Sequence, residues 1–413
     1  MNHGRSVIAR PAMVAGSIGL GLLLSACGGP APSPPGAAPD PAVAQTRTGI
    51  DWKKQPTAAW TAPAGTELVG VTDDRVVLYD YVKGLTGLDL TTGQVAWEAE
   101  EPDQCAMSAS TLFCYDMTSG DGNYRDPKTG AEGNAVALGA DVAFVEAGPR
   151  GVYSVHSALD GGIETPAVNA WDLDGKRAWT VNGPEAGYYW DPLSPISVRG
   201  EFVQVVLYRD PASGSDTWHV LLNPADGSVV AEDATVTERG ELVRIGETST
   251  ELLDDKGDVV RTVKGRVGIE GEEPIDPAGD VLTVDDFQLQ PVAPDGSSRW
   301  TAPADPYGSV RTCGDRATVS EQHSLTLIDT TSGETLWQIP APVPFPVVQC
   351  AGDVLLTTKE QVEGNEDGPP TMVAVDAATG DELWFIPAAG TGTWTAAGLL
   401  VHDVGEQAVR LYR

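Results

Sequence analysis

The chain has 413 residues, of which 41% are hydrophobic, so it can bury a large core. Lys and Arg together number 26 against 59 Asp and Glu, which gives a formal net charge of −33. A surface of that sign repels polyanions, and we expect no nucleic-acid partner. The excess of acid is typical of a soluble exported surface, or of one that recruits cations or a basic partner.

Residues 1–26 are expected to form a lipoprotein signal peptide that is removed from the mature protein. A positively charged start precedes the apolar run 12–24, which is too short to cross a bilayer comfortably. The run ends in LSAC at 24–27, which resembles the lipobox of bacterial lipoproteins. The resemblance implies cleavage before Cys27, a lipidated Cys27 thiol with further acylation such as palmitate, and an extracytoplasmic, membrane-anchored protein. The alternative is an ordinary secretion signal in which Cys27 has no role.

A Pro-, Ala- and Gly-rich linker is expected from the lipidated cysteine to the first folded residues, over 27–50. Its composition cannot supply a packed core and is typical of a partly extended spacer. The remainder, 51–413, is expected to form one domain.

One short phrase recurs along this domain. It reads LDLTTGQVAW at 88–97, IDTTSGETLW at 328–337 and VDAATGDELW at 375–384. Each copy has an apolar–Asp pair, a turn containing Gly, and a Trp at a fixed distance beyond the turn. Recurrence at this spacing indicates stacked copies of one small unit.

Short alternating segments separated by turn residues predict an all-β fold from about residue 58. The clearest unit has four strand patterns within 66–99, which predicts a four-stranded antiparallel propeller blade. Counting units gives eight or nine blades, with 103–147 as the ambiguous region, and we expect eight. The last segment stops one strand short of a blade, and the segment around Trp60 supplies a strand without partners. We therefore expect the ring to close by pairing the N-terminal strand with the C-terminal blade.

The recurring phrase resembles the PQQ-like, quinoprotein-type β-propeller repeat, and the resemblance covers roughly 58–413. In that family the repeat Trp docks between neighbouring blades. The resemblance implies the same structural role here for Trp60, Trp97, Trp179, Trp300, Trp337 and Trp384.

Four further cysteines predict two disulfides, because an exported protein folds in an oxidising compartment. A hairpin turn at 109–110 would place Cys105 opposite Cys114. Cys313 and Cys350 occupy matching places in two successive repeats, so a bridge between neighbouring units is expected. The alternative is four buried free thiols.

No catalytic, phosphate-binding or metal-ligand motif stands out in the sequence. Quinoprotein dehydrogenases, which the repeat resembles, use a vicinal disulfide and a Ca²⁺ site, and no vicinal Cys pair is present. We expect no cofactor, no metal and no enzymatic activity. The alternative is a hydrolase or lyase centred on the channel.

Longer connections are expected at 119–130, 184–192 and 359–370. The second contains Tyr188, Tyr189 and Trp190, an aromatic cluster suited either to a partner surface or to the core. The resemblance implies a non-enzymatic interaction scaffold that binds proteins of the cell envelope. The alternative is a small-molecule or carbohydrate binding protein, or sensor, that uses the central channel.

Overall fold

A computed structural model provides the structure of the chain. The residues that it describes are 50–100, 104–108, 110–139, 142–160, 163–183, 189–190, 196–208, 217–237, 240–246, 248–267, 279–305, 308–321, 324–340, 349–359, 371–387, 390–403 and 406–413. Over these residues the regular structure consists of strands, with no helix. The expected all-β class is confirmed.

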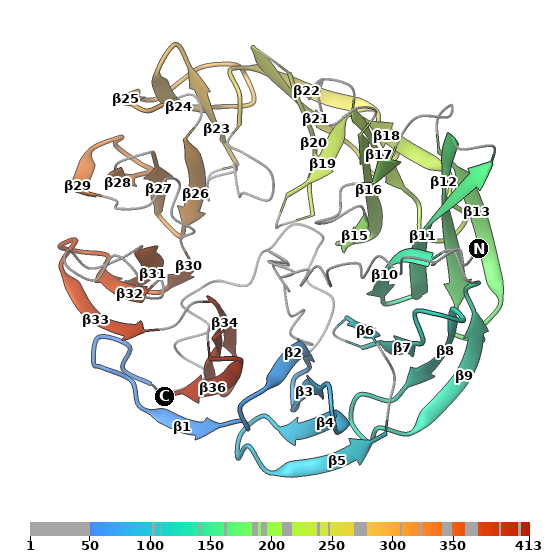
Figure 1. Cartoon of the computed structure of the whole chain (residues 1–413). Coiled ribbons are helices and arrows are strands. Elements are labelled where there is room, and N and C mark those ends of the chain that lie inside the picture. Colours follow the sequence, from blue (N-terminus) through green and yellow to red (C-terminus); the bar gives the residue numbers. More distant parts are fainter. Residues whose placement is uncertain are drawn as a thin grey trace, which may run out of the picture.

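The strands form a ring of radially arranged antiparallel sheets (Figure 1). In the regular blades the chain runs from the inner strand outward to the perimeter, and then crosses to the inner strand of the next blade. Strands packed between two neighbouring sheets are apolar on both faces. In the first unit, Val76 and Leu78 face the blade on one side, while Val77 and Leu85 face the blade on the other.

The first three blades each have four strands. Blade one contains β2 (Thr66–Val71), β3 (Arg75–Asp80), β4 (Gly84–Asp89) and β5 (Val95–Ala99). Blade two contains β6 (Gln104–Met107), β7 (Leu112–Tyr115), β8 (Asp121–Arg125) and β9 (Glu132–Ala137). Blade three contains β10 (Val142–Gly148), β11 (Gly151–Asp160), β12 (Ile163–Asp172) and β13 (Arg177–Asn182).

The next three blades depart from strict regularity. Blade four has five strands, β14 (Tyr189–Trp190), β15 (Ile196–Arg199), β16 (Phe202–Tyr208), β17 (Thr217–Leu222) and β18 (Val229–Glu232). Blade five has β19 (Ala234–Val236), β20 (Leu242–Ile245), β21 (Ser249–Leu253) and β22 (Val259–Lys264). Blade six has three described strands, β23 (Val281–Asp285), β24 (Gln288–Val292) and β25 (Ala302–Pro303).

The last three blades again have four strands each. Blade seven contains β26 (Ser309–Cys313), β27 (Arg316–Ser320), β28 (Ser324–Asp329) and β29 (Thr335–Pro340). Blade eight contains β30 (Gln349–Ala351), β31 (Val354–Lys359), β32 (Thr371–Asp376) and β33 (Glu382–Pro387). Blade nine contains β34 (Gly390–Thr395), β35 (Gly398–Asp403), β36 (Ala408–Tyr412) and β1 (Ala58–Thr61).

The described residues therefore form nine sheets, and the expectation of eight blades was wrong. The difference lies in the region that the sequence left ambiguous, where 104–137 form the complete sheet of blade two. The expectation of a longer connection at 119–130 was also wrong. Those residues contain strand β8 with a tight turn on either side, and Gly122, Tyr124 and Arg125 of this strand are buried.

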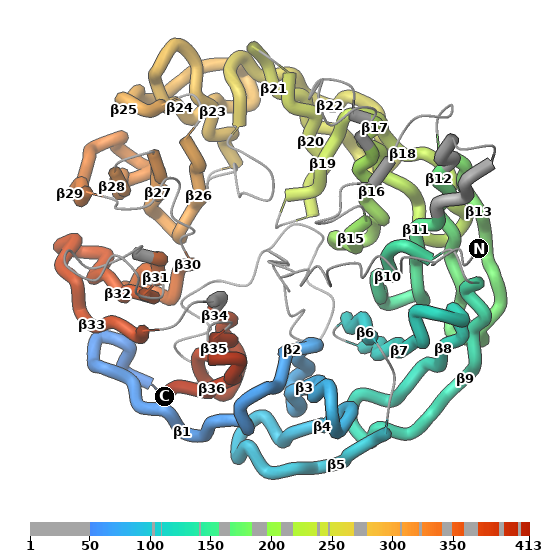
Figure 2. The backbone as a smooth tube through the Cα atoms, in the orientation of Figure 1, coloured from blue at the N-terminus to red at the C-terminus, as the bar shows by residue number. Residues whose placement is uncertain are grey.

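Blade nine joins the two ends of the domain. Strand β1 pairs antiparallel with β36, with Trp60 opposite Leu411. Figure 2 shows the blue N-terminal strand beside the red C-terminal strands. Thr57 and Arg413 extend the ladder by exchanging two backbone hydrogen bonds, of 2.9 and 3.0 Å.

Buried apolar clusters fill the seams between neighbouring blades. One of them combines Leu400 and Leu411 of blade nine with Val71 and Val76 of blade one. Another combines Leu221 of blade four with Val236 of blade five. Because each blade buries both of its faces in this way, the core of the domain is distributed around the ring.

Candidate interaction surface

The strand order fixes which turns meet at each end of the ring. The turns between first and second strands, and between third and fourth strands, lie at one end, which we call the Asp-turn end. The turns between second and third strands, and the crossings between blades, lie at the opposite end, which we call the crossing end. This division follows from the antiparallel pairing of consecutive strands.

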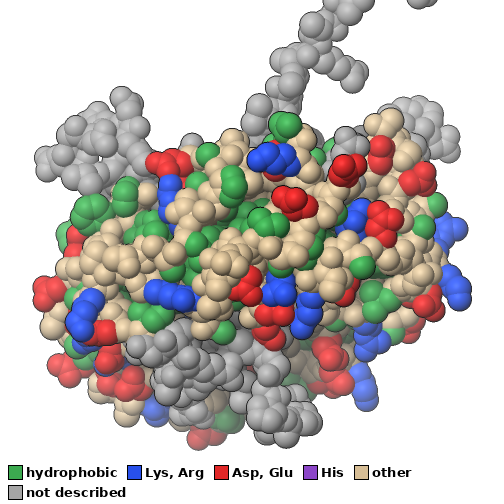
Figure 3. Space-filling view, turned by 90° about the horizontal axis from the view of Figure 1, so that it is seen from below, with side chains coloured by type: hydrophobic (Ala, Val, Ile, Leu, Met, Phe, Trp, Pro, Cys, Tyr) green, Lys and Arg blue, Asp and Glu red, His purple; other side chains and the backbone are tan. Residues whose placement is uncertain are grey.

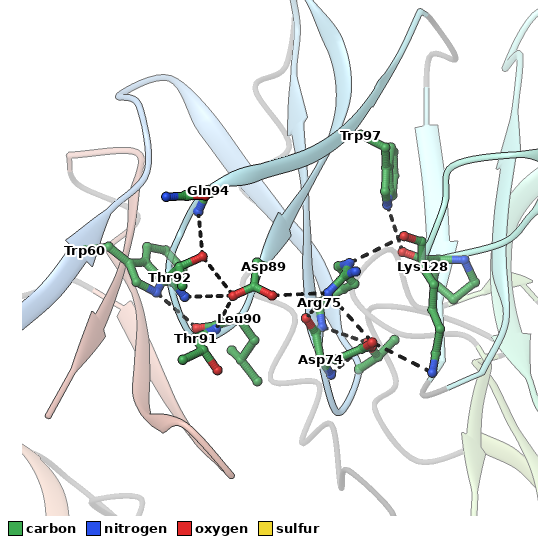
Figure 4. Close-up of polar contacts among 12 residues, drawn as sticks. Trp60, Asp74, Arg75, Asp89, Leu90, Thr91, Thr92, Gln94, Trp97 and Lys128 are labelled. Atoms are coloured by element: carbon green, nitrogen blue, oxygen red, sulfur yellow. Dashed lines mark hydrogen bonds and ion pairs between the residues drawn. The ribbon is translucent and has the colours of Figure 1, made fainter.

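The aspartate of the recurring phrase caps its own turn at the Asp-turn end. The Asp89 Oδ1 atom accepts the Thr91 N–H at 3.1 Å and the Thr92 N–H at 2.8 Å (Figure 4). Hydrogen bonds from the Thr92 hydroxyl and from its N–H hold the pKa of Asp89 below its ordinary value. The same cap recurs at Asp329, which accepts the N–H groups of Thr331 and Ser332. These carboxylates therefore accept hydrogen bonds from the backbone of their own turns.

Five of the six repeat Trp residues dock against the turn between the third and fourth strands of the next blade, and Trp384 docks against the N-terminal segment at Trp52. The Trp97 Nε1–H donates to the Pro127 carbonyl at 3.0 Å (Figure 4). The indole lies so close to Gly130 that a Cβ atom there would come within 2.6 Å of it, and the φ of 71° at Gly130 also favours glycine. All six Trp residues singled out in the sequence make this bond, over 2.7 to 3.1 Å. The donor–acceptor pairs are Trp60 with Leu90, Trp97 with Pro127, Trp179 with Pro224, Trp300 with Thr330, Trp337 with Ala377, and Trp384 with Trp52.

Three docking positions carry no Trp, and sequence reasoning missed them. Asn134 takes the position in blade two and donates its Nδ2–H to the Leu173 carbonyl at 2.9 Å. Arg261 takes it in blade five and donates to the Val292 carbonyl. Ala231 takes it in blade four and has no side-chain donor. Their place four residues after a turn Gly was the signal in the sequence, because Trp97, Trp179, Trp337 and Trp384 follow their glycines at the same distance.

Both expected disulfides are present. Cys105 and Cys114 face each other across strands β6 and β7, with a Cα–Cα distance of 4.1 Å. Cys313 at the end of β26 bonds to Cys350 in β30, with a Cα–Cα distance of 5.7 Å, and so links blades seven and eight.

Other candidate residues of the sequence fall partly outside the described residues. Cys27, Tyr188 and the domain boundary at 26 lie outside the described residues, and the boundary at 50 coincides with the first of them. Tyr189 and Trp190 form β14, which pairs with Tyr208 and Leu207 of β16. Their role as a partner surface stays a prediction.

The inner strand of blade three carries a desolvated acid, Glu146 of β10. Burial raises its pKa to about 8, so the carboxyl retains its proton near neutral pH more than an ordinary glutamate does. On the neighbouring strand, the Nε2 atom of His156 lies 2.6 Å from the Oγ atom of the buried Ser154. Across the described part of the chain, no three His, Cys, Asp or Glu side chains gather as metal ligands would.

The side wall of the ring mixes charges with single apolar residues (Figure 3). Most of its exposed large apolar side chains stand on outer strands, as Val95 does on β5 and Phe385 on β33. Single residues of this kind are normal on a soluble surface. Val259 and Val260 are consecutive exposed residues on the outer strand β22, whereas Tyr81 and Val82, at the crossing end of blade one, are consecutive exposed residues at the tip of a turn.

Comparisons with known proteins agree with the repeat. A PQQ-type family model described as outer membrane protein assembly factor BamB matches residues 285–402. The chain carries PQQ-like repeats in a β-propeller. Blades seven and eight, with their two docking Trp residues Trp337 and Trp384, lie inside the matched range. No curated protein sequence matches the chain.

Solved structures with a similar arrangement have low sequence identity. BamB from Moraxella catarrhalis is 15% identical with a TM-score of 0.43, covering 75% of this chain and 96% of its own. The computationally designed Ika8 protein is 9% identical with a TM-score of 0.45, covering 86% and 98%. Apo AztD from Citrobacter koseri is 11% identical with a TM-score of 0.39, covering 79% and 86%. Among the described residues there is no helix long and apolar enough to cross a membrane.

Proposed function

We propose that this PQQ-like propeller is a protein-interaction scaffold of the cell envelope, anchored to the outer side of a membrane through a lipidated Cys27. It acts by binding rather than by catalysis. The lipobox-like LSAC at 24–27 and the following spacer support the anchoring. The description of the matching family model, an outer membrane protein assembly factor, supports the envelope and the binding role.

The observation that carries this proposal is the docking at the blade seams. At eight of the nine docking positions a side-chain donor bonds a carbonyl of the next blade or, for Trp384, of the N-terminal segment. Hydrogen bonds between so many neighbouring blades make the ring rigid. A rigid ring keeps the loops at each of its two ends at fixed separations, which a binding surface with several contacts requires. In this proposal the pairing of β1 with β36 closes the ring and keeps the frame from opening.

In-cell crosslinking of the full-length protein, followed by mass spectrometry, tests the scaffold role. We expect one or a few envelope proteins in near-stoichiometric amounts. A soluble Cys27→Ala version serves as the comparison, because it retains the propeller without its anchor. Recovery of no protein partner from the anchored form would contradict the proposal and would turn attention to small-molecule ligands.

The anchor has an independent test. Cys27→Ala should move the protein from the membrane fraction to the soluble exported fraction, while Cys27 in the unmodified protein should carry the lipid. Unchanged membrane association of the variant would show that the lipobox reading is wrong and would leave the scaffold role to the crosslinking result.

A further inference from the structure

We propose that the β3–β4 turn of blade one, with Tyr81 and Val82 at its tip, is a docking point for a protein segment that carries Lys or Arg beside an apolar side chain. This inference rests on the proposed scaffold function and assigns it one contact site. The site lies at the crossing end of the ring.

The turn is held in one conformation by the side chain of Asp80. The Asp80 Oδ1 atom accepts the Val82 N–H at 2.8 Å and the Lys83 N–H at 3.1 Å. Gly84, opposite Asp80 in the ladder, adopts a φ of 87°, which a glycine tolerates without strain. The tip therefore presents its side chains from a fixed hairpin.

Tyr81 is both exposed and immobilised. Its side chain is 66% exposed, and Val82 beside it is 92% exposed. The ring meets Tyr79 edge-to-face with centroids 5.1 Å apart, and its hydroxyl donates to Glu67 Oε1 at 2.8 Å. Two contacts thus fix an aromatic ring that remains largely open to solvent.

An immobilised exposed aromatic ring is what a binding anchor needs. Its rotamer entropy has already been lost in the free protein, so less is lost when a partner binds. Partial desolvation of the hydroxyl and its hydrogen bond to Glu67 raise the pKa of Tyr81 to about 12. By contrast, Val95 on the outer strand of the same blade is an exposed aliphatic side chain within regular strand structure.

The charges around the turn select the partner. The carboxylates of Glu67 and Asp80 outnumber the ammonium group of Lys83, and the whole chain carries a net charge of −33. A cation placed against the Tyr81 ring would meet both the aromatic face and the Glu67 carboxylate. Val82 offers apolar contact beside it. The same negative field disfavours insertion of this tip into an anionic membrane surface.

A photoreactive residue at position 82 of the full-length anchored protein tests the proposal, with position 95 as the matched control. Both replace a valine on blade one, but Val95 lies on the outer strand β5. We expect position 82 alone to crosslink a protein segment containing Lys or Arg next to an apolar residue. Crosslinks to lipid, or equal crosslinking from position 95, would overturn the inference.

Substitution of the tip residues provides a second test of the docking point. Tyr81→Ala with Val82→Ser should reduce recovery of that partner at least about tenfold, and added salt should weaken binding by the unmodified protein. Val95→Ser should leave recovery unchanged. Unfolding curves that overlay for both variants would show that the ring is intact. If general crosslinking still captures a partner that the Tyr81 and Val82 changes do not affect, the scaffold stands and this docking point is wrong. If general crosslinking captures none, both fail.

Discussion

The indole N–H of Trp384 donates to the backbone carbonyl of Trp52 at 2.7 Å, across 332 positions of sequence. At the other five Trp seams the acceptor belongs to the turn between the third and fourth strands of the next blade. Blade nine has no such turn, because its third strand ends at the C-terminus and its fourth strand is β1. The segment before β1 therefore replaces the missing turn, and Trp52 packs edge-to-face on Trp394 with ring centroids 4.5 Å apart.

Trp52 therefore fixes the N-terminal segment against blades eight and nine. Trp52→Ala should lower the free energy of unfolding by about 3–5 kcal/mol, because it empties a fully buried site. Urea unfolding of the purified domain measures the change. Lys54→Ala, at a side chain that is 80% exposed, should be close to neutral. A Trp52 variant as stable as the Lys54 variant would show that the segment does not secure blade nine.

The docking hydrogen bond can be separated from the packing of the ring. Trp337→Phe keeps an aromatic side chain but leaves the Ala377 carbonyl without its 3.1 Å donor. We expect the free energy of unfolding, measured in urea, to fall by about 1–3 kcal/mol more than the lost ring volume alone would cause. Trp394→Phe is the matched control, since its buried Nε1 has no hydrogen-bond partner among the described residues. Equal losses in the two variants would assign the stability to ring volume alone.

The two disulfides should contribute unequally. Cys313–Cys350 closes a sequence separation of 37, whereas Cys105–Cys114 closes one of 9. Loop-closure entropy gives about 4 kcal/mol for the first and about 3 kcal/mol for the second. Paired Cys→Ala variants compared in urea measure both, and thiol titration of the denatured, unreduced mature domain should find none of these four thiols. A larger loss from removing the shorter bridge would contradict the entropic account.

The raised pKa of Glu146 predicts that the stability of the folded protein falls as pH rises. Its pKa is raised to about 8 in the folded protein, so below about pH 4.5 both states hold the proton and no penalty exists. As pH rises from there to about 8, the unfolded chain releases a proton that the folded protein keeps, and stability falls. Glu146→Gln should therefore gain on the order of 1–2 kcal/mol over the unmodified protein at pH 8 and nothing at pH 4.5. Thermal unfolding at constant ionic strength measures the difference.

The exposed Glu98 of β5 provides the comparison for this experiment. Glu98→Gln should show no gain that grows with pH. A pH-independent difference between Glu146→Gln and the unmodified protein would mean that the carboxyl is solvated at neutral pH.

Several features of the fold were predictable because they depend on neighbours in the sequence. The alternation within 66–99 predicted four strands that the structure confirms as β2 to β5. The Asp and Gly of each phrase predicted the turns, and the resemblance to the PQQ-like repeat implied that its Trp residues dock between blades. The number of blades was not predictable, since blade two carries Asn134 at its docking position and blade six has only three described strands.

The sequence by itself predicted the all-β class, the repeat and the Cys105–Cys114 pair from local spacing and turn chemistry, and the Cys313–Cys350 pair from matching places in two successive repeats. Only the tertiary structure decided what fills a seam when the Trp is missing. Asn134 and Arg261 each reach a carbonyl of the next blade, and Trp52 becomes an acceptor because β1 pairs with β36 in blade nine. The exposure and fixed orientation of Tyr81 were likewise settled by Tyr79 and Glu67, which lie beside it only after the strands pair.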